Sequence, residues 1–228
     1  QETVRHFFRS GGSSGTIAKA MSAYDKDFSD AIYGVEKDGR YVTESRVKKM
    51  LSHETELIEK RLDRVKHPNK MFFSYANTVA TIDFAKQFKG HGWVGIRYQI
   101  DPDEDYNEII LHIRFKETDA RLQQETLGIL GVHLIYGAYY KYNDPKRLLR
   151  YLYDHLDKDQ LEIDTINFSG PRFADVDNRL MSLQLVKNGM TDAVMFDPNG
   201  KNILPAAILY KKNILALRGS FRPVTKVN

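Results

Sequence analysis

The fold follows from one stretch in the middle of the chain, residues 93–115, which reads WVGIRYQIDPDEDYNEIILHIRF. Apolar and polar residues alternate on both sides of an acidic, proline-containing segment at 101–107. Alternation with a period of two is typical of a β-strand with one buried face, and proline next to aspartate favours a turn. The stretch therefore predicts two antiparallel strands, 93–100 and 108–115, joined as a hairpin.

The same alternation assigns the two faces of the hairpin. Even-numbered positions of the first strand and odd-numbered positions of the second are apolar and are expected to face the core. Arg97, His112 and Arg114 then share the other face. With the turn centred near residues 104–105, Arg97 would lie opposite His112, because the register decides which side chains meet. We expect a small basic face beside Trp93 that could hold an anion.

Outside the hairpin, the spacing of apolar residues predicts four helices and three further strands. The helices are expected at 43–65, at 120–142, from Asp144-Pro145 onward, and at 176–187; the strands at 71–79, 161–168 and 191–196. Residues 120–142 are apolar around most of the helix circumference, which indicates a buried central helix. Residues 203–217 could supply two more short strands.

The order strand–helix–strand in the last third favours a right-handed crossover between parallel strands. The expected fold class is therefore α/β, with α+β as the alternative. It combines an antiparallel hairpin-containing sheet in the first half, a β-α-β unit in the last third and a long buried central helix. No linker divides the chain, so residues 1–228 are expected to form a single domain.

Composition limits the function classes. The chain has 228 residues, of which 42% are hydrophobic and 28% charged, and it has no cysteine. Disulfides, thiolate metal sites and cysteine nucleophiles are therefore excluded. No apolar run approaches the roughly 20 residues that span a bilayer, and no segment resembles a secretory signal, so a cytoplasmic protein without a membrane partner is expected. The net charge of +4 without a lysine/arginine arm argues against nucleic acid as a partner.

A glycine- and serine-rich segment at residues 10–19 is the first candidate site. Consecutive glycines let backbone N–H groups converge, and hydroxyls and a lysine add donors and charge, so the segment could cradle a phosphate. The candidate ligand-binding residues are Ser13, Ser14, Gly15, Thr16 and Lys19. The spacing matches neither the P-loop nor the dinucleotide fingerprint. A flexible N-terminal loop without a ligand is the alternative.

A polar loop at residues 169–179 is the second candidate site, because open α/β sheets bind ligands between a strand and the following helix. Its candidates are Ser169, Arg172, Asn178 and Arg179 for ligand binding and Asp175 and Asp177 for catalysis. The two aspartates could bind Mg²⁺ beside a phosphate, although two acids at this spacing do not define a metal site. The alternative is a capped helix, with Asp175 as N-cap and Arg179 pairing back along the helix.

A histidine between two glycines, in Gly90-His91-Gly92, is the third candidate. Such a histidine is accessible enough for general acid–base work, and His112 on the neighbouring strand is a second candidate for proton transfer. A simple turn is the alternative for His91. The remaining histidines show no spacing typical of metal ligands, so no metal site is expected from them.

Several segments together resemble a known group of proteins. They are GTIAK at 15–19 with MSAYD at 21–25, DAIYG at 30–34, GHGW at 90–93, LGILGV at 127–132, FSGP at 168–171 and DNRLMSL at 177–183. They resemble the N-terminal half of a larger bacterial cytoplasmic family of undetermined activity, and the resemblance covers nearly the whole chain. Some members of that family are labelled nicotinate-nucleotide adenylyltransferase. The His-x-Gly-His motif shared by such enzymes does not occur in this sequence. The resemblance implies a second domain after Asn228, with which an active site could be shared.

The leading functional hypothesis is an enzyme domain, or half of one, that acts on or binds a phosphorylated small molecule or nucleotide. In this scheme the N-terminal segment binds phosphate, Arg97 and Arg172 clamp its charge, His91 or His112 carries the proton, and Asp175 or Asp177 acts as base or metal ligand. No cofactor is indicated. The alternatives are a non-catalytic interaction or assembly module, which could form a homo-oligomer, and nucleic-acid binding. All site assignments require the distant segments to meet in one pocket.

Overall fold

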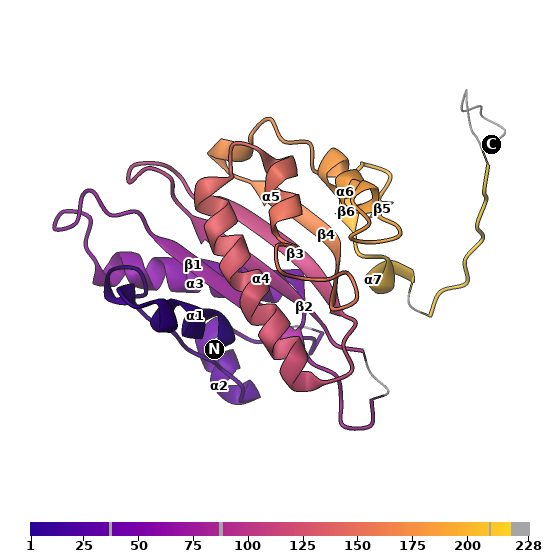
Figure 1. Cartoon of the computed structure of the whole chain (residues 1–228), viewed down its shortest axis with the longest axis horizontal. Helices are drawn as coiled ribbons and strands as arrows, with labels where there is room; N and C mark the ends of the chain where they lie inside the picture. Colours follow the sequence, from indigo (N-terminus) through magenta and orange to yellow (C-terminus); the bar gives the residue numbers. More distant parts are fainter. Residues whose placement is uncertain (37, 87–88, 210, 220–228) are drawn as a thin grey trace.

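A computed structural model describes residues 1–36, 38–86, 89–209 and 211–219. Its centre is a four-stranded sheet in the order β1-β2-β3-β4, in which every neighbouring pair is antiparallel (Figure 1). The strands are β1 (Phe73–Ala80), β2 (His91–Tyr98), β3 (Asn107–Phe115) and β4 (Leu161–Ser169). The structure therefore confirms a mixed α/β class with the expected hairpin at the middle of the sheet.

The register of this hairpin differs from the expected one. Arg97 pairs with Glu108, and His112 lies opposite Trp93. The expected pairing of Arg97 with His112 is wrong because the turn is centred near residues 102–103. Gln99 fixes that turn: its Nε2 donates to the carbonyl oxygens of Pro102 at 3.2 Å and of residue 104 at 2.8 Å. The assignment of faces is confirmed, since the apolar positions of both strands are buried in the main core.

The long helix α4 (Ala120–Tyr140) covers one face of the sheet, as expected, together with α5 (Pro145–Tyr151) (Figure 1). Asp144 caps α5 by accepting a hydrogen bond from the backbone of Arg147. The N-terminal helix α1 (Glu2–Ser10) packs against α4 at Gly131, where an added Cβ would lie 2.4 Å from the hydroxyl oxygen of Thr3. Glycine is therefore required for this close approach of the two helices.

The opposite face of the sheet is covered over β1 and β2 by α3 (Glu44–Arg61). Thr43 caps this helix by accepting a hydrogen bond from the backbone N–H of Arg46 at 3.1 Å, and the helix ends at residue 61 instead of 65. A small apolar cluster fixes α3 to the sheet: Val47, Leu51, Ala76, Trp93 and Ile110.

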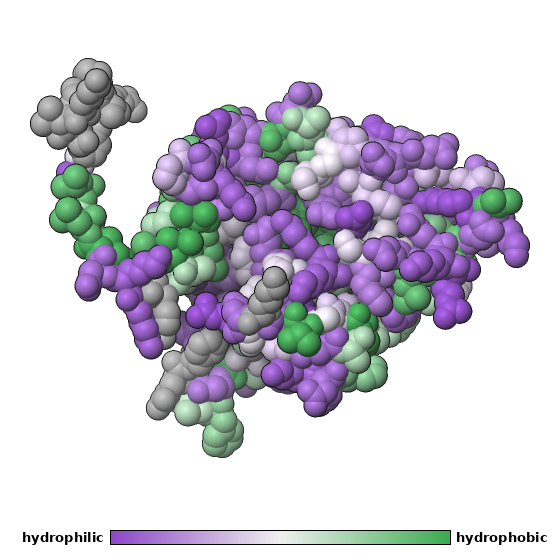
Figure 2. All heavy atoms as spheres, turned by 180° about the vertical axis from the view of Figure 1, so that it is seen from behind, coloured by the Kyte–Doolittle hydropathy of each residue, from purple (hydrophilic) through white to green (hydrophobic). Residues whose placement is uncertain are grey.

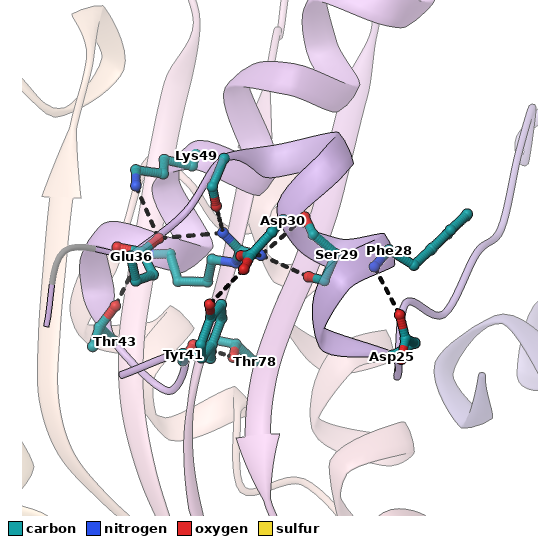
Figure 3. A network of polar contacts seen from close by, with 11 residues as sticks. Asp25, Phe28, Ser29, Asp30, Glu36, Tyr41, Thr43, Lys49 and Thr78 are labelled. Atoms are coloured by element: carbon teal, nitrogen blue, oxygen red, sulfur yellow. Dashed lines mark hydrogen bonds and ion pairs between the residues drawn. The ribbon is translucent and has the colours of Figure 1, made fainter. Parts of the chain in front are cut away.

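A polar network anchors α3 to the short helix α2 (Lys26–Tyr33) and to the loop that follows it (Figure 3). The side chain of Arg46 is only 2% exposed and lies between the carboxylates of Asp30 and Glu36, at 3.6 and 3.4 Å. Lys49 adds an ion pair with Glu36 at 2.9 Å. The hydroxyl of Tyr41 donates to Asp30 at 2.7 Å. The network holds α2 and the loop that follows it against α3.

The last third departs from the expected β-α-β unit. After β4 come the 3₁₀ turn η2 (Pro171–Phe173) and α6 (Asn178–Lys187), and then β5 (Met195–Phe196). β5 pairs antiparallel with β6 (Asn202–Ile203) in a separate two-stranded sheet, so the expected parallel crossover is wrong. The turn between them closes this short hairpin, since the backbone N–H of Asp197 donates to the carbonyl of Lys201 at 2.9 Å.

The C-terminal part of the described chain contains one short strand, β6, instead of the two expected within 203–217. Proline at the first helical position suits a helix, and α7 (Pro205–Leu209) begins there. None of the helices in the described ranges combines the length and the apolar character needed to cross a bilayer.

Candidate functional site

A cluster of ionisable side chains lies on the α3 side of the sheet, across β2, β3 and β4. The Nδ1 of His112 is 2.7 Å from Oδ1 of Asp164, and its Nε2 is 3.1 Å from Nδ1 of His91. The guanidinium Nε of Arg114 lies 2.9 Å from the second carboxylate oxygen of Asp164. We call these four residues the histidine cluster. Its atoms form one continuous polar chain from a carboxylate to His91.

A β-bulge in β4 brings Asp164 into this cluster. The pairing of β3 with β4 shifts between His112 and Ile113, which lie opposite Thr165 and Ile163 respectively. Asp164 is therefore the extra residue of β4, without a partner in the ladder. Bulges of this kind redirect a side chain and are frequent beside active sites. The carboxylate of Asp164 reaches His112 although Thr165 is the ladder partner of that histidine.

The inner part of the histidine cluster is closed to solvent. His112 is 1% exposed and Asp164 5%, and the ring of Trp93 lies against His112 with 5.0 Å between ring centroids. Burial of a carboxylate is costly unless charged or hydrogen-bonding partners compensate it. His112 and Arg114 supply that compensation. A rigid, buried carboxylate–imidazole pair of this kind fixes the orientation and the tautomer of the histidine.

The hydrogen bonds indicate how the protons are placed. The carboxylate of Asp164 can only accept, so the Nδ1 of His112 carries a proton and donates it. We assign the neutral ring to His112 in the proposed resting state of the cluster. The Nε2 of His112 is then an acceptor for the Nδ1–H of His91. Each histidine then donates a hydrogen bond from its Nδ1, His91 to His112 and His112 to Asp164. The arrangement can pass a proton along this line.

Burial lowers the pKa of His91 below its ordinary value of 6.5, and the neighbouring His112 and Arg114 lower it further, while Asp164 opposes them. Neutral His91 is therefore the dominant form at neutral pH. A neutral imidazole can accept a proton from a bound molecule, which is the requirement for a general base.

The lowered pKa of His91 leads to a test of stability against pH. The unfolded chain binds this proton at a higher pH than the native chain does. The contribution of His91 to the free energy of unfolding is therefore greatest above pH 6.5, where the ring is neutral in both states. This contribution is lost as the pH falls from 6.5 toward the lower pKa of native His91. We expect His91→Gln to reduce the stability difference between pH 7.5 and 5.5 by about 0.5–1 kcal/mol, discounted for partial exposure.

Urea unfolding at the two pH values measures this difference. His133, whose pKa burial also lowers, has the same sign and should preserve part of the pH dependence in the variant. His155→Gln, at an exposed position, is the matched control. An identical pH dependence in His91→Gln and in the unmodified chain would contradict the assigned role of His91.

A shallow basic depression of about 530 Å³ opens on the same side of the sheet, between α3 and the turn that precedes β6. Its lysines are Lys48, Lys49 and Lys201. Lys48 pairs with Glu44 at 2.6 Å, whereas Lys201 makes no ion pair within the described part of the chain. The surface on this side is mainly hydrophilic (Figure 2). Lys49 is paired with Glu36, so Lys201 supplies the unpaired positive charge of the described lining, which contains no residue of the histidine cluster.

Among the residues that the sequence analysis selected, the structure brings His91, His112 and Arg114 together. The N-terminal segment lies elsewhere. Ser13–Gly15 form a 3₁₀ turn, η1, in which Ser14 and Gly15 are exposed and which follows a helix and not a strand. Lys19 pairs with Glu54 at 2.8 Å. Thr16 lines a groove beside α4, on the opposite side of the sheet from the histidine cluster.

The selected arginines have partners within the chain. Arg97 pairs with Glu108 at 2.6 Å, on the α3 side, at the opposite end of β2 from His91. Arg172 pairs with Glu104 at 2.7 Å and with Asp101. The expected meeting of Thr16, Arg97 and Arg172 in one pocket is therefore not found in the described part of the chain.

The polar loop after β4 caps a helix. Asp177, and not Asp175, is the N-cap of α6, and it also pairs with Arg179 at 2.7 Å, which holds the pKa of Asp177 at about 2. The side-chain amide of Asn178 bonds both backbone groups of Phe168, at 2.7 and 2.9 Å. Ser169 and Asp175 are exposed. The capped-helix interpretation thus accounts for Asp177, Asn178 and Arg179, with a different N-cap.

Sequence reasoning missed Asp164, although a signal was present. In strand 161–168 the apolar positions are 161, 163, 166 and 168, so their phase changes between 163 and 166. Such a change of phase is what a bulge produces. Among the described residues, no three histidine, aspartate or glutamate side chains are arranged so that they could hold a metal ion together.

Comparison with known proteins adds no relative: no family model, no curated protein and no solved structure matches the chain.

Proposed function

We propose that this chain is an enzyme domain that performs general acid–base chemistry on a phosphorylated small molecule or nucleotide, with the histidine cluster as its proton-transfer site. The observation that supports this proposal is the continuous hydrogen-bonded line from the buried carboxylate of Asp164 through His112 to His91. Catalytic sites combine a titratable base with an orienting acid in this way.

Each member of the cluster has a distinct role in the proposed reaction. His91 accepts a proton from the substrate or returns one to it. His112 receives the displaced Nδ1 proton of His91 at its Nε2, and Asp164 stabilises the imidazolium that forms. Arg114, whose side chain is 41% exposed, supplies positive charge for an anionic group of the substrate. The lysine-lined depression on the same side favours a negatively charged ligand.

Other parts of the earlier hypothesis stay predictions. These are the resemblance to the N-terminal half of a larger bacterial family and a second domain that shares the site. The phosphate site that joined the N-terminal segment to Arg97 and Arg172 is not proposed again, because these residues do not meet in the described part of the chain. The proposed function does not require them, since its groups come from β2, β3 and β4.

A thermal-shift screen tests the proposal. The panel contains inorganic phosphate, sugar phosphates, and nucleoside mono-, di- and triphosphates, each at millimolar concentration. A ligand present at about one hundred times its Kd stabilises the native state by about 2.7 kcal/mol. We expect at least one phosphorylated compound to raise the Tm, and its unphosphorylated counterpart to have no effect.

Two matched variants locate the binding. Arg114→Gln should abolish the shift caused by the stabilising compound. Arg121→Gln removes an exposed arginine, paired with Glu125, from the first turn of α4 and should leave the shift unchanged. A flat profile with every phosphorylated compound would count against the proposal. A flat profile together with self-association in light scattering would favour the assembly module, for which the exposed apolar residues Ile214, Leu215 and Leu217 would be the contact segment.

A further inference from the structure

The two edges of the main sheet differ in how their backbone groups are satisfied. β4 forms one edge and β1 the other (Figure 1). In an antiparallel sheet, every second residue of an edge strand turns its backbone N–H and carbonyl away from the neighbouring strand. Such a row of unpaired groups is a template for another extended chain unless the protein covers it. The partners of each row therefore show whether that edge is closed.

The edge at β4 is closed by side chains of the same chain. Asn178 from α6 bonds both backbone groups of Phe168, and Nδ2 of Asn202 from β6 donates to the carbonyl of Ile166 at 3.0 Å. The hydroxyl of Tyr153 bonds the backbone of β4 at two further positions, one N–H at 3.2 Å and one carbonyl at 3.0 Å. Three side chains thus replace the missing neighbour of β4.

The direction of the backbone groups in β1 follows from its pairing with β2. The backbone N–H of Gln99 donates to the carbonyl of Phe72 at 3.1 Å, so Phe72 bonds to the β2 side. Because this bonding alternates along an antiparallel pair, the even-numbered residues of β1 bond to β2. The odd-numbered residues turn their N–H and carbonyl groups outward: Phe73, Tyr75, Asn77 and Val79. We call these four the outward residues.

The edge at β1 is open. None of the backbone groups of the outward residues has a hydrogen-bond partner in the part of the chain that the structure describes. β1 also lacks the features that commonly protect an edge strand, since its eight residues include no charged residue and no proline, and its pairing with β2 has no bulge. The contrast with β4 indicates an interaction surface whose partner is an extended strand.

The side chains of β1 complement those of a second β1. With a two-fold axis at Ala76, Phe73 would lie opposite Val79 of the other copy. The same axis would set Tyr75 opposite Asn77. An aromatic and a β-branched side chain form a favourable cross-strand pair, and no like charges meet because β1 carries none. An axis at Tyr75 or at Asn77 would instead pair one outward residue with a residue beyond β1.

We propose that two copies of this chain dimerise by antiparallel pairing of β1 with β1 about a two-fold axis at Ala76. The two sheets then form one continuous sheet with the β1 strands at its centre. A second copy closes both open edges at once, because each edge supplies the partner of the other. The histidine cluster lies on β2, β3 and β4, so the dimer and the proposed acid–base function can fail independently.

Size-exclusion chromatography with light scattering measures the oligomeric state, and we expect a dimer at about 100 μM chain. Asn77→Pro removes one outward N–H and no bond of the β1–β2 ladder, so the monomer should tolerate proline at this edge position. We expect this variant to be monomeric, with the circular dichroism spectrum of the unmodified chain. Leu215→Pro, at an exposed position after α7, is the matched control and should remain dimeric.

Amide hydrogen exchange followed by NMR tests the interface in the unmodified chain. In the proposed dimer, the amides of the outward residues should be protected from exchange as the inward amides of Ser74 and Ala76 are. In a monomer, the outward amides should exchange at least about tenfold faster than these internal controls.

A monomer at about 100 μM chain would overturn the proposal. A dimer whose outward amides exchange rapidly would overturn it as well, because the contact would then lie elsewhere. The same conclusion would follow if Leu215→Pro dissociated the dimer and Asn77→Pro left it intact.

Discussion

Replacement of Arg46 by methionine is expected to lower the free energy of unfolding by about 3–5 kcal/mol, which is a large share of the stability of a typical domain. Arg46 is the only positive charge that faces both Asp30 and Glu36 within the described network. Methionine would fill a similar volume but would leave two carboxylates near each other without this cation. Removing one partner of a buried ion pair costs more than the pair itself contributes.

Further contacts of Arg46 increase the expected loss. Its guanidinium donates to the backbone carbonyls of Gly34 and Ser29, at 2.5 and 3.0 Å. It also lies over the rings of Tyr33 and Tyr41, at 5.4 and 5.0 Å from their centroids. These groups belong to α2 and to the loop that follows it, so the loss should include detachment of that segment from α3.

Chemical denaturation measures the loss, and limited proteolysis shows whether the α2 segment opens first. Arg61→Met, at an exposed position in the last turn of α3, is the control and should change stability by less than about 0.5 kcal/mol. Adding Asp30→Asn to Arg46→Met should recover part of the loss, because Arg46 is the cation that pairs with Asp30, whereas Glu36 keeps its ion pair with Lys49. A loss below about 1 kcal/mol in Arg46→Met would contradict the importance of the network.

The main sheet and its faces could be predicted from the sequence because the deciding signal is local. Apolar alternation at 93–115 gave both strands within two residues and placed the correct side of each in the core. The register could not be predicted in the same way. It depends on the side chain of Gln99 closing the turn, and many turn lengths are compatible with the acidic segment 101–107.

The last third shows a different limit of sequence reasoning. Residues 191–196 have the composition of a strand, but only Met195 and Phe196 form one. Thr191 instead donates its hydroxyl hydrogen to Glu162 of β4 at 2.7 Å. Whether a segment joins the main sheet depends on tertiary contacts of this type, which cannot be predicted from strand propensity.

The candidate site was only partly predictable, for a related reason. His91 and His112 were selected for their residue type and their neighbours, and the structure places Nδ1 of His91 3.1 Å from Nε2 of His112. Arg114 was selected from its strand face. Asp164 was not selected, because the sequence analysis did not pair strand 161–168 with strand 108–115, and that pairing places Asp164 beside His112. The glycine- and serine-rich segment at 10–19 has a composition that suits phosphate binding. Composition alone does not predict which surface of the protein a segment lies on.

Asp164→Asn is expected to have the largest effect on the proposed chemistry. In the native cluster, one carboxylate oxygen accepts from Nδ1 of His112, and the other lies beside the donor Nε of Arg114. Asparagine has only one acceptor oxygen. Arg114 can only donate, so the oxygen should turn toward Arg114 and the amide NH₂ toward His112.

This change would reverse the proton arrangement of the cluster. With an NH₂ group facing it, the Nδ1 of His112 must become an acceptor, and the proton moves to Nε2. The bond to His91 then runs in the opposite direction, and His112 can no longer receive a proton from His91. Two-dimensional ¹H–¹⁵N correlation spectra of the imidazole rings distinguish the two tautomers directly, and they require no substrate.

Turnover of the compound found in the thermal-shift screen should fall by about 10²–10⁴-fold in Asp164→Asn, the usual range for loss of a positioned acid–base group. Binding of the compound should persist, because Arg114 and the lysines are unchanged. Asp159→Asn, which alters an exposed aspartate in the turn before β4, is the matched control and should preserve both tautomer and turnover. If Asp164→Asn keeps the Nδ1–H tautomer of His112, or keeps full turnover, the carboxylate does not direct the proton and the histidine cluster loses its proposed role.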